Sequence, residues 1–297
     1  MENSGFSWYG RLSMAGPTQP SRRFVRADLL LPGDVFLSRS ADKDSAWIAW
    51  ATLGQFSHAA IYPAKYSYCL FESSDDGVGF VGLDVVKICR DPGQDQHIVL
   101  ADVSHHQTLE IRRHPELAKH GRTDSERREV EYRLAECLVP TYGFEYPALE
   151  ALGNAVPYLP GWVVKPVLRT IARMRREPAA IVPGLFCSQV VFEALKYLEA
   201  APLRRDRPSE TVSPNTLARP SLSRLEVVKG VIVDETFACE PLHPDSTALK
   251  DIRQSQQSLL RQADTAREQG YKKSLLAANA SLERLLTLYK SLAPHIS

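Results

Sequence analysis

The sequence predicts an α+β protein in which a small, mostly antiparallel sheet packs against helices. In the first part of the chain, short segments rich in β-branched and aromatic residues alternate with Pro, Gly and Asp, which is typical of strands and turns. Later segments place apolar residues at helical spacing instead. Strands and helices that occupy separate blocks of the chain favour α+β architecture.

The composition is that of an ordinary globular protein. Of 297 residues, 44% are hydrophobic and 24% are charged, and the net charge is +1. This balance provides no global field that would favour nucleic acid, and we expect none as a partner. No apolar run reaches the roughly 18 residues of a transmembrane helix. Residues 1–23, rich in Ser, Gly, Pro and Arg, are expected to form a flexible tail without a signal peptide.

Cysteine and histidine patterns give no sign of a metal or a cofactor. The five cysteines are widely spaced and odd in number, which is typical of a reducing compartment and not of a disulfide scaffold. Four histidines, His105, His106, His114 and His120, fall within residues 104–120. They lack the spacing of known zinc motifs, so a polar loop or a helix end is favoured over a metal site.

The strands are expected at residues 34–37, 57–62, 68–73, 80–88 and 96–103, with a final strand at 225–233. Between the first two, residues 44–56 have helical spacing with Gly54 as the C-cap. Trp47 and Trp50 lie on the apolar face of that helix. They either pack in the core or form the wall of an apolar groove.

A helical insertion is expected over residues 105–180. Its clearest helix covers residues 123–139, where Thr123 or Asp124 is the N-cap and apolar residues recur every four positions. Further along, the stretch from Gly161 to Arg176 has an apolar face, five positive charges and no acid. This stretch either binds peripherally to an anionic membrane or forms an ordinary amphipathic helix with a solvated basic face.

Three regions follow from these elements. A tail covers residues 1–23, a main domain covers 24–243, and residues 244–297 form a C-terminal helical hairpin. The hairpin has leucines at helical spacing on both sides of Gly270. It is expected to pack on the main domain or on a partner protein.

The segment LFCSQVVFEAL, residues 185–195, places Cys187 where an apolar approach becomes a helix. Pro183 and Gly184 break the chain just before it. A thiol in the first helical turn lies near unpaired backbone N–H groups and the positive end of the helix dipole, which favour the nucleophilic thiolate. The alternative is that Cys187 is simply a small buried apolar residue.

His58 and Glu72 are expected to meet across a hairpin. If the turn between residues 57–62 and 68–73 is centred on Lys65, His58 and Glu72 are directly opposite and share a face. A carboxylate beside an imidazole fixes the ring tautomer and stabilises the imidazolium. The alternative is a surface pair that contributes under about 1 kcal/mol.

In chain order the motifs are Gly33-Asp34, Ser57-His58, Glu72, Tyr142-Gly143 and Phe186-Cys187-Ser188-Gln189. This order resembles the circularly permuted branch of the NlpC-type papain-like cysteine hydrolases, the YiiX-like group, kin to lecithin retinol acyltransferase. The resemblance covers residues 29–103 and 142–233 and leaves the insertion and the C-terminal hairpin unexplained. Gln189 and Glu145 depart from the residues commoner in that group.

The resemblance implies a permuted papain-like fold, with the sheet packed against the helix that carries Cys187. It implies Cys187 as nucleophile, His58 as general base and Glu72 as the orienting acid. The residues expected to contact substrate are Trp47, Trp50, Tyr62, Tyr142 and Ser188.

Three functions fit this site. The first is a thiol hydrolase that cleaves a peptide or peptidoglycan-type amide through an acyl-enzyme. The second is a phospholipid acyl hydrolase or acyltransferase of the same fold, and the third is a binding module without activity. The chain is expected in the cytoplasm of the producing cell, or exported without a cleavable signal peptide as an effector or toxin.

Overall fold

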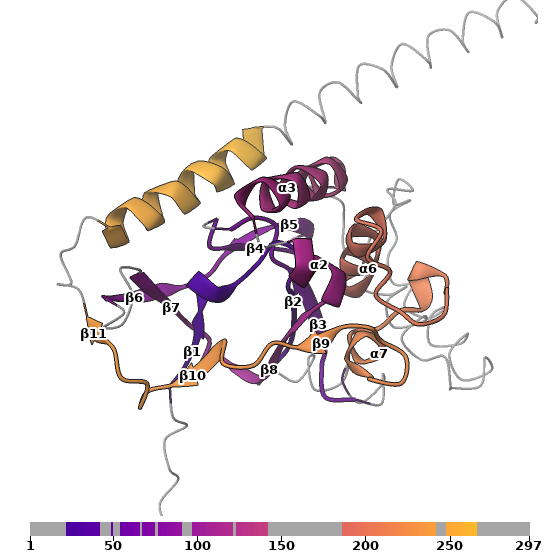
Figure 1. Ribbon diagram of the computed structural model, residues 1–297, viewed down its shortest axis with the longest axis horizontal. Helices are drawn as coiled ribbons and strands as arrows, with labels where there is room; N and C mark the ends of the chain where they lie inside the picture. The colour runs from indigo at the N-terminus through magenta and orange to yellow at the C-terminus, as the bar shows by residue number, and fades with distance from the viewer. Residues whose placement is uncertain are drawn as a thin grey trace, which may run out of the picture.

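The computed structural model is an α+β protein with two antiparallel sheets and a layer of helices (Figure 1). The structure describes residues 22–41, 49, 54–65, 67–74, 77–90, 97–120, 123–141, 186–241 and 248–265. One apolar core lies between the helices and the six-stranded sheet, and a second joins the two sheets. No helix within the described residues is long and apolar enough to cross a bilayer.

The larger sheet has six strands in the order β5-β4-β3-β2-β8-β9. Its strands are β2 (Val35–Ser40), β3 (His58–Ile61), β4 (Cys69–Ser74), β5 (Gly77–Gly82), β8 (His106–Arg113) and β9 (Glu226–Val227). The strands expected at residues 34–37, 57–62 and 68–73 are confirmed as β2, β3 and β4. These three adjacent strands form the part of the sheet that carries the candidate site.

The second sheet has five strands in the order β10-β1-β7-β6-β11. Its strands are β1 (Arg23–Arg26), β6 (Val85–Arg90), β7 (His97–Asp102), β10 (Ile232–Asp234) and β11 (Glu240–Pro241). The expectation of one sheet of about five strands was therefore wrong. The expected tail also ends earlier than residue 23, because Arg23 already belongs to β1 and pairs with Asp234.

Two segments expected to be single strands are each divided between the sheets. Residues 80–88 break at Leu83 and Asp84, so that β5 and β6 lie in different sheets. Residues 225–233 break at Gly230, whose φ of 74° is in the left-handed region, so that β9 and β10 separate. Strand propensity is continuous through both segments, and only the long-range pairing shows the change of sheet.

Besides the helix at residues 248–265, the helices include α2 (Pro115–His120), α3 (Asp124–Leu138), α6 (Cys187–Tyr197) and α7 (Pro214–Ala218), with 3-10 turns η1 (Ala27–Leu29), η2 (Val139–Thr141) and η3 (Ser209–Thr211). The helix expected at residues 123–139 is confirmed as α3. Thr123 accepts a hydrogen bond from the Glu126 N–H at 3.2 Å, and Glu126 accepts one from the Thr123 N–H at 3.2 Å. This reciprocal capping box is the reason that the helix begins where it does.

The expected helical insertion over residues 105–180 was wrong at its start. Residues 106–113 form β8, which lies between β2 and β9, and not a polar loop or helix end. Its Leu109 and Ile111 are buried in the core shared by the two sheets. The histidines and charged residues of this segment hide the apolar alternation of a strand in the sequence. In the structure, neighbouring strands pair with both of its edges.

The two faces of the six-stranded sheet contact different cores. In β3, Ala59 and Ile61 pack against the helices, while Ala60 faces the second sheet. This is the ordinary alternation of a strand. His58, the first residue of β3, has the parity of Ala60 and lies at the end of the strand, where it interacts with Cys187, the first residue of α6.

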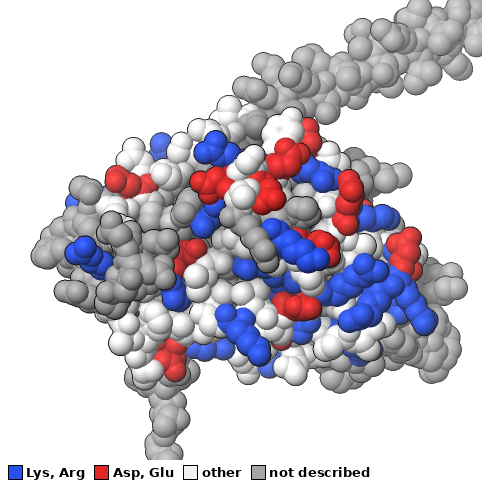
Figure 2. All heavy atoms as spheres, in the orientation of Figure 1, with Lys and Arg blue, Asp and Glu red and all other residues white. Residues whose placement is uncertain are grey.

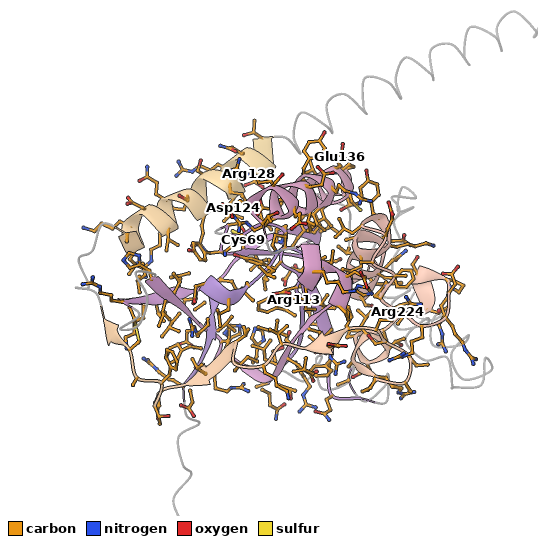
Figure 3. The ribbon with its side chains drawn as sticks, in the orientation of Figure 1. Cys69, Arg113, Asp124, Arg128, Glu136 and Arg224 are labelled. Carbon is orange, nitrogen blue, oxygen red and sulfur yellow. A yellow bond between two sulfur atoms is a disulfide. The ribbon has the colours of Figure 1, made fainter. Side chains whose placement is uncertain are left out.

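A buried ion pair holds the start of β2 against β8. Asp34 is 0% exposed, and both of its carboxylate oxygens accept hydrogen bonds at 2.6 and 2.7 Å from Arg113, which is labelled in Figure 3. Gly33 precedes it with a φ of 90°, and a Cβ there would lie 2.5 Å from Leu117. The Gly33-Asp34 motif is thus a tight turn followed by an anchoring acid.

Two long-range links complete the fold. Cys89 and Cys239 form a disulfide across 150 residues, so the expectation that disulfides do not organise these cysteines was wrong for this pair. The helix of residues 248–265 packs on the main domain, where Gln256 donates to the carbonyls of Tyr68 and Leu83 at 2.6 and 3.0 Å. The second half of the expected C-terminal hairpin lies outside the described residues.

Candidate active site

The structure brings the three expected catalytic residues together at one end of the sheet. His58 begins β3, Glu72 lies in β4, and Cys187 is the first residue of α6. The helix α6 packs against both strands (Figure 1). Residues that are far apart in the sequence therefore meet where a strand and a helix begin.

His58 and Glu72 form a direct contact, although the predicted register was wrong. Nε2 of His58 lies 3.0 Å from Oε2 of Glu72. The residue directly opposite Glu72 is Ala60, two positions further along β3 than His58. A shift of two residues keeps both side chains on the same face, so the pair meets diagonally across the strands.

Cys187 approaches the imidazole from the helical layer. The helix begins as expected, with the Val190 N–H donating to the Phe186 carbonyl at 2.9 Å. The Cys187 side chain belongs to the core between α6 and the sheet, and Cys187 is one of the two groups that raise the pKa of His58. The other is Glu72, which lies against Nε2.

The groups beside His58 favour its imidazolium form. Burial alone lowers the pKa of His58, but the charges of Cys187 and Glu72 and hydrogen bonds to both outweigh it and hold this pKa well above its usual value. Burial raises the pKa of Glu72, and the charge and hydrogen bond of His58 more than offset this, so that the pKa of Glu72 is lowered. These shifts favour the imidazolium form of His58 beside the Glu72 carboxylate.

A second histidine adjoins the pair and was not expected there. His106, at the start of β8, interacts electrostatically with both His58 and Glu72. Burial first, and then the neighbouring histidines, lower the pKa of His106 to about 4, so its ring is neutral at pH 7. The sequence showed four clustered histidines but could not show which of them lies beside Glu72, because β8 reaches the site through its pairing with β2.

A cavity of about 530 Å³ opens beside His58 and Glu72, in the range typical of small-ligand sites. Its ionisable lining residues are His58, Glu72, Asp84, Asp102, His105 and His106. Among the described residues that line it, none is Lys or Arg. Figure 2 shows Lys and Arg beside Asp and Glu across the face in view.

Two of the expected substrate contacts were wrong. Tyr62 is 0% exposed and packs in the core shared by the two sheets. Ser188 is 3% exposed and donates its hydroxyl to the Val212 carbonyl at 2.6 Å, so its side chain is structural. Each of the two residues is close to a proposed catalytic residue in the sequence. In the fold, however, its side chain is covered by other elements.

The remaining expected contacts, Trp47, Trp50 and Tyr142, lie outside the described residues, as does the basic stretch from Gly161 to Arg176. The helix expected at residues 44–56 is described only at Ala49 and from Gly54 onward. There the Gly54 N–H donates to the Ala49 carbonyl at 3.0 Å, as expected of a glycine that ends a helix.

The comparisons with known proteins do not assign a function, so the geometry of the site is the basis for proposing one. No protein-family model matches the sequence, and no curated protein matches it.

Proposed function

We propose that this protein is a thiol hydrolase that cleaves an amide bond, with Cys187 as nucleophile, His58 as general base and acid, and Glu72 as the residue that orients His58. The observation that carries the proposal is that one imidazole contacts both a carboxylate, at 3.0 Å, and the thiol at a helix N-terminus. A nucleophile, a base and an orienting group in mutual contact are the elements of covalent acyl transfer.

The proposed reaction passes through a thioester. The Cys187 thiolate attacks the carbonyl carbon, and the C–N bond breaks as the His58 imidazolium gives its proton to the leaving nitrogen. His58 then accepts a proton from water, whose oxygen attacks the thioester, and the C–S bond breaks to return the thiolate. The backbone N–H of Cys187, which has no acceptor within the helix, would donate to the developing oxyanion.

The cavity beside His58 and Glu72 supports an amide in preference to a phospholipid, and Cys187, which is 4% exposed, is not among its lining residues. Three carboxylates and three imidazoles line it, and such groups pair with the N–H donors and ammonium groups of peptides. A phosphate-bearing headgroup would meet the carboxylates with the same sign of charge. The order of His58, Glu72 and Cys187 along the chain also supports the permuted papain-like interpretation of the fold.

Two substrates test the proposal. Wild-type protein and Cys187→Ala are incubated with peptidoglycan fragments and, separately, with phospholipid vesicles. Cys137→Ala is the matched control, because Cys137 packs at the edge of the same helical core from α3 but is not among the groups that act on the pKa of His58. We expect the wild type and Cys137→Ala to cleave the fragments and Cys187→Ala to be inactive.

Other outcomes have distinct meanings. Cleavage of vesicles alone, lost in Cys187→Ala, would assign the lipid acyl activity instead. Equal turnover by wild type and Cys187→Ala would reject the mechanism. A wild-type thiol that does not react with a mild electrophile at neutral pH would favour the binding module.

A further inference from the structure

The N-terminal turn of α6 is tied to residues 209–215, the segment that contains η3 and the start of α7. Ser188, next to Cys187, donates its hydroxyl to the Val212 carbonyl at 2.6 Å. Gln189 donates its side-chain amide to the Ser209 hydroxyl at 3.2 Å. Both bonds act within the first helical turn, so they fix the position of Cys187 relative to this segment.

The same segment holds the approach to His58. Asn215 is 7% exposed, and its side-chain amide makes both backbone hydrogen bonds of Phe56, 159 residues away. Oδ1 accepts from the Phe56 N–H at 3.0 Å, and Nδ2 donates to the Phe56 carbonyl at 2.7 Å. One residue later, the Ser57 N–H donates to the Ser38 carbonyl at 3.0 Å and joins the sheet. The backbone that leads into His58 is therefore fixed on both sides.

Only an asparagine of this reach satisfies the site. The contact requires one donor and one acceptor in a planar group, and an aspartate at this position would offer only acceptors. Gly54 makes room for it, because a Cβ there would lie 2.0 Å from the Asn215 side chain. Ser213 caps α7 by accepting from the Thr216 N–H at 3.1 Å, which fixes the helical turn that carries Asn215.

We propose that Asn215 is a positioning residue for the Cys187–His58 pair, because residues 209–215 bind both the backbone that leads into the strand of the base and the helix that carries the nucleophile. This inference rests on the proposed function. Proton transfer between His58 and Cys187 requires the imidazole ring and the thiol to lie at hydrogen-bond distance. A displacement of about 1 Å in such a pair can reduce the rate about 100-fold.

The test compares Asn215→Ala with Ser223→Ala in the full chain. Ser223 is a suitable control because it is 2% exposed in the same loop region and also makes two hydrogen bonds to the backbone, at 3.3 and 3.0 Å. The measurements are the pH titration of the His58 ring by NMR, the rate of Cys187 alkylation, and kcat and KM. We expect Asn215→Ala to move the His58 titration to lower pH and to reduce kcat about 10- to 100-fold with little change in KM.

Ser223→Ala is expected to lower stability while leaving the His58 titration as in the wild type. If both variants lose activity only in proportion to their loss of stability, with an unchanged His58 titration, the positioning role is overturned and the proposed function stands. If wild-type His58 titrates no differently from His58 in Cys187→Ala, the proposed function itself fails. Should Asn215→Ala not fold, Ser188→Ala makes the same test from the helix side, and an unchanged His58 titration there overturns the inference.

Discussion

Replacement of Glu72 by glutamine changes one charge at the candidate site and keeps the shape of the side chain. The His58 and Glu72 side chains are 28% and 17% exposed and 3.0 Å apart, so solvent screens the pair only partly. A hydrogen bond to a charged group of this kind contributes about 1.5–3 kcal/mol. If the imidazolium loses that stabilisation at the transition state, Glu72→Gln lowers kcat about 10- to 100-fold.

The assay is the pH dependence of kcat/KM on a peptidoglycan fragment. In the wild type, the raised pKa of His58 keeps the imidazolium, the acid that protonates the leaving group, present to higher pH. Without the Glu72 charge, the pKa of His58 falls. The alkaline limb of the profile, where the imidazolium loses its proton, should therefore move to lower pH in Glu72→Gln.

Two comparisons make the result decisive. Glu110→Gln is the matched control, because Glu110 is also a half-buried carboxylate in an ion pair of the same sheet, with Arg112. It should leave the pH profile in place. His58→Ala removes the base itself and should reduce kcat more than Glu72→Gln does. A wild-type profile in Glu72→Gln, or a milder effect of His58→Ala, would refute the assigned roles.

Three further predictions concern stability, thiol chemistry and the C-terminal helix. Arg113→Ala leaves the fully buried carboxylate of Asp34 unpaired and should lower the free energy of unfolding by about 3–5 kcal/mol in urea titrations; a loss below about 1 kcal/mol would contradict the anchoring role. Iodoacetamide at neutral pH should label Cys187 before Cys69, because burial raises the pKa of Cys69 to about 11; mass spectrometry showing the opposite order would count against an activated thiol. Gln256→Ala removes both hydrogen bonds that tie this helix to the Tyr68 and Leu83 carbonyls, which keep their backbone donors, and should increase hydrogen exchange in residues 248–265; unchanged protection would show that apolar contacts alone hold this helix.

Local chemistry was enough to predict several parts of the molecule. The capping box at Thr123 and Glu126 fixes the start of α3 because donor and acceptor lie three residues apart. The break before Phe186 and the apolar spacing after it predict α6 with Cys187 at its N-terminus. Strand parity places His58 and Glu72 on one face, and a register error of two residues leaves that result intact.

The tertiary structure decided whatever depends on pairing between distant segments. Nothing local shows that residues 80–88 supply strands to two sheets, or that a histidine-rich segment becomes β8 in the middle of one of them. The disulfide of Cys89 and Cys239 and the bonds from Asn215 to Phe56 span more than a hundred residues, and their partners carry no shared pattern. The sequence by itself determined which residues are able to form the candidate site, because side-chain chemistry and strand or helix period are local. Only the tertiary structure decided which backbone groups hold the site residues in place, because these contacts join segments that are distant in the sequence and meet only in the folded chain.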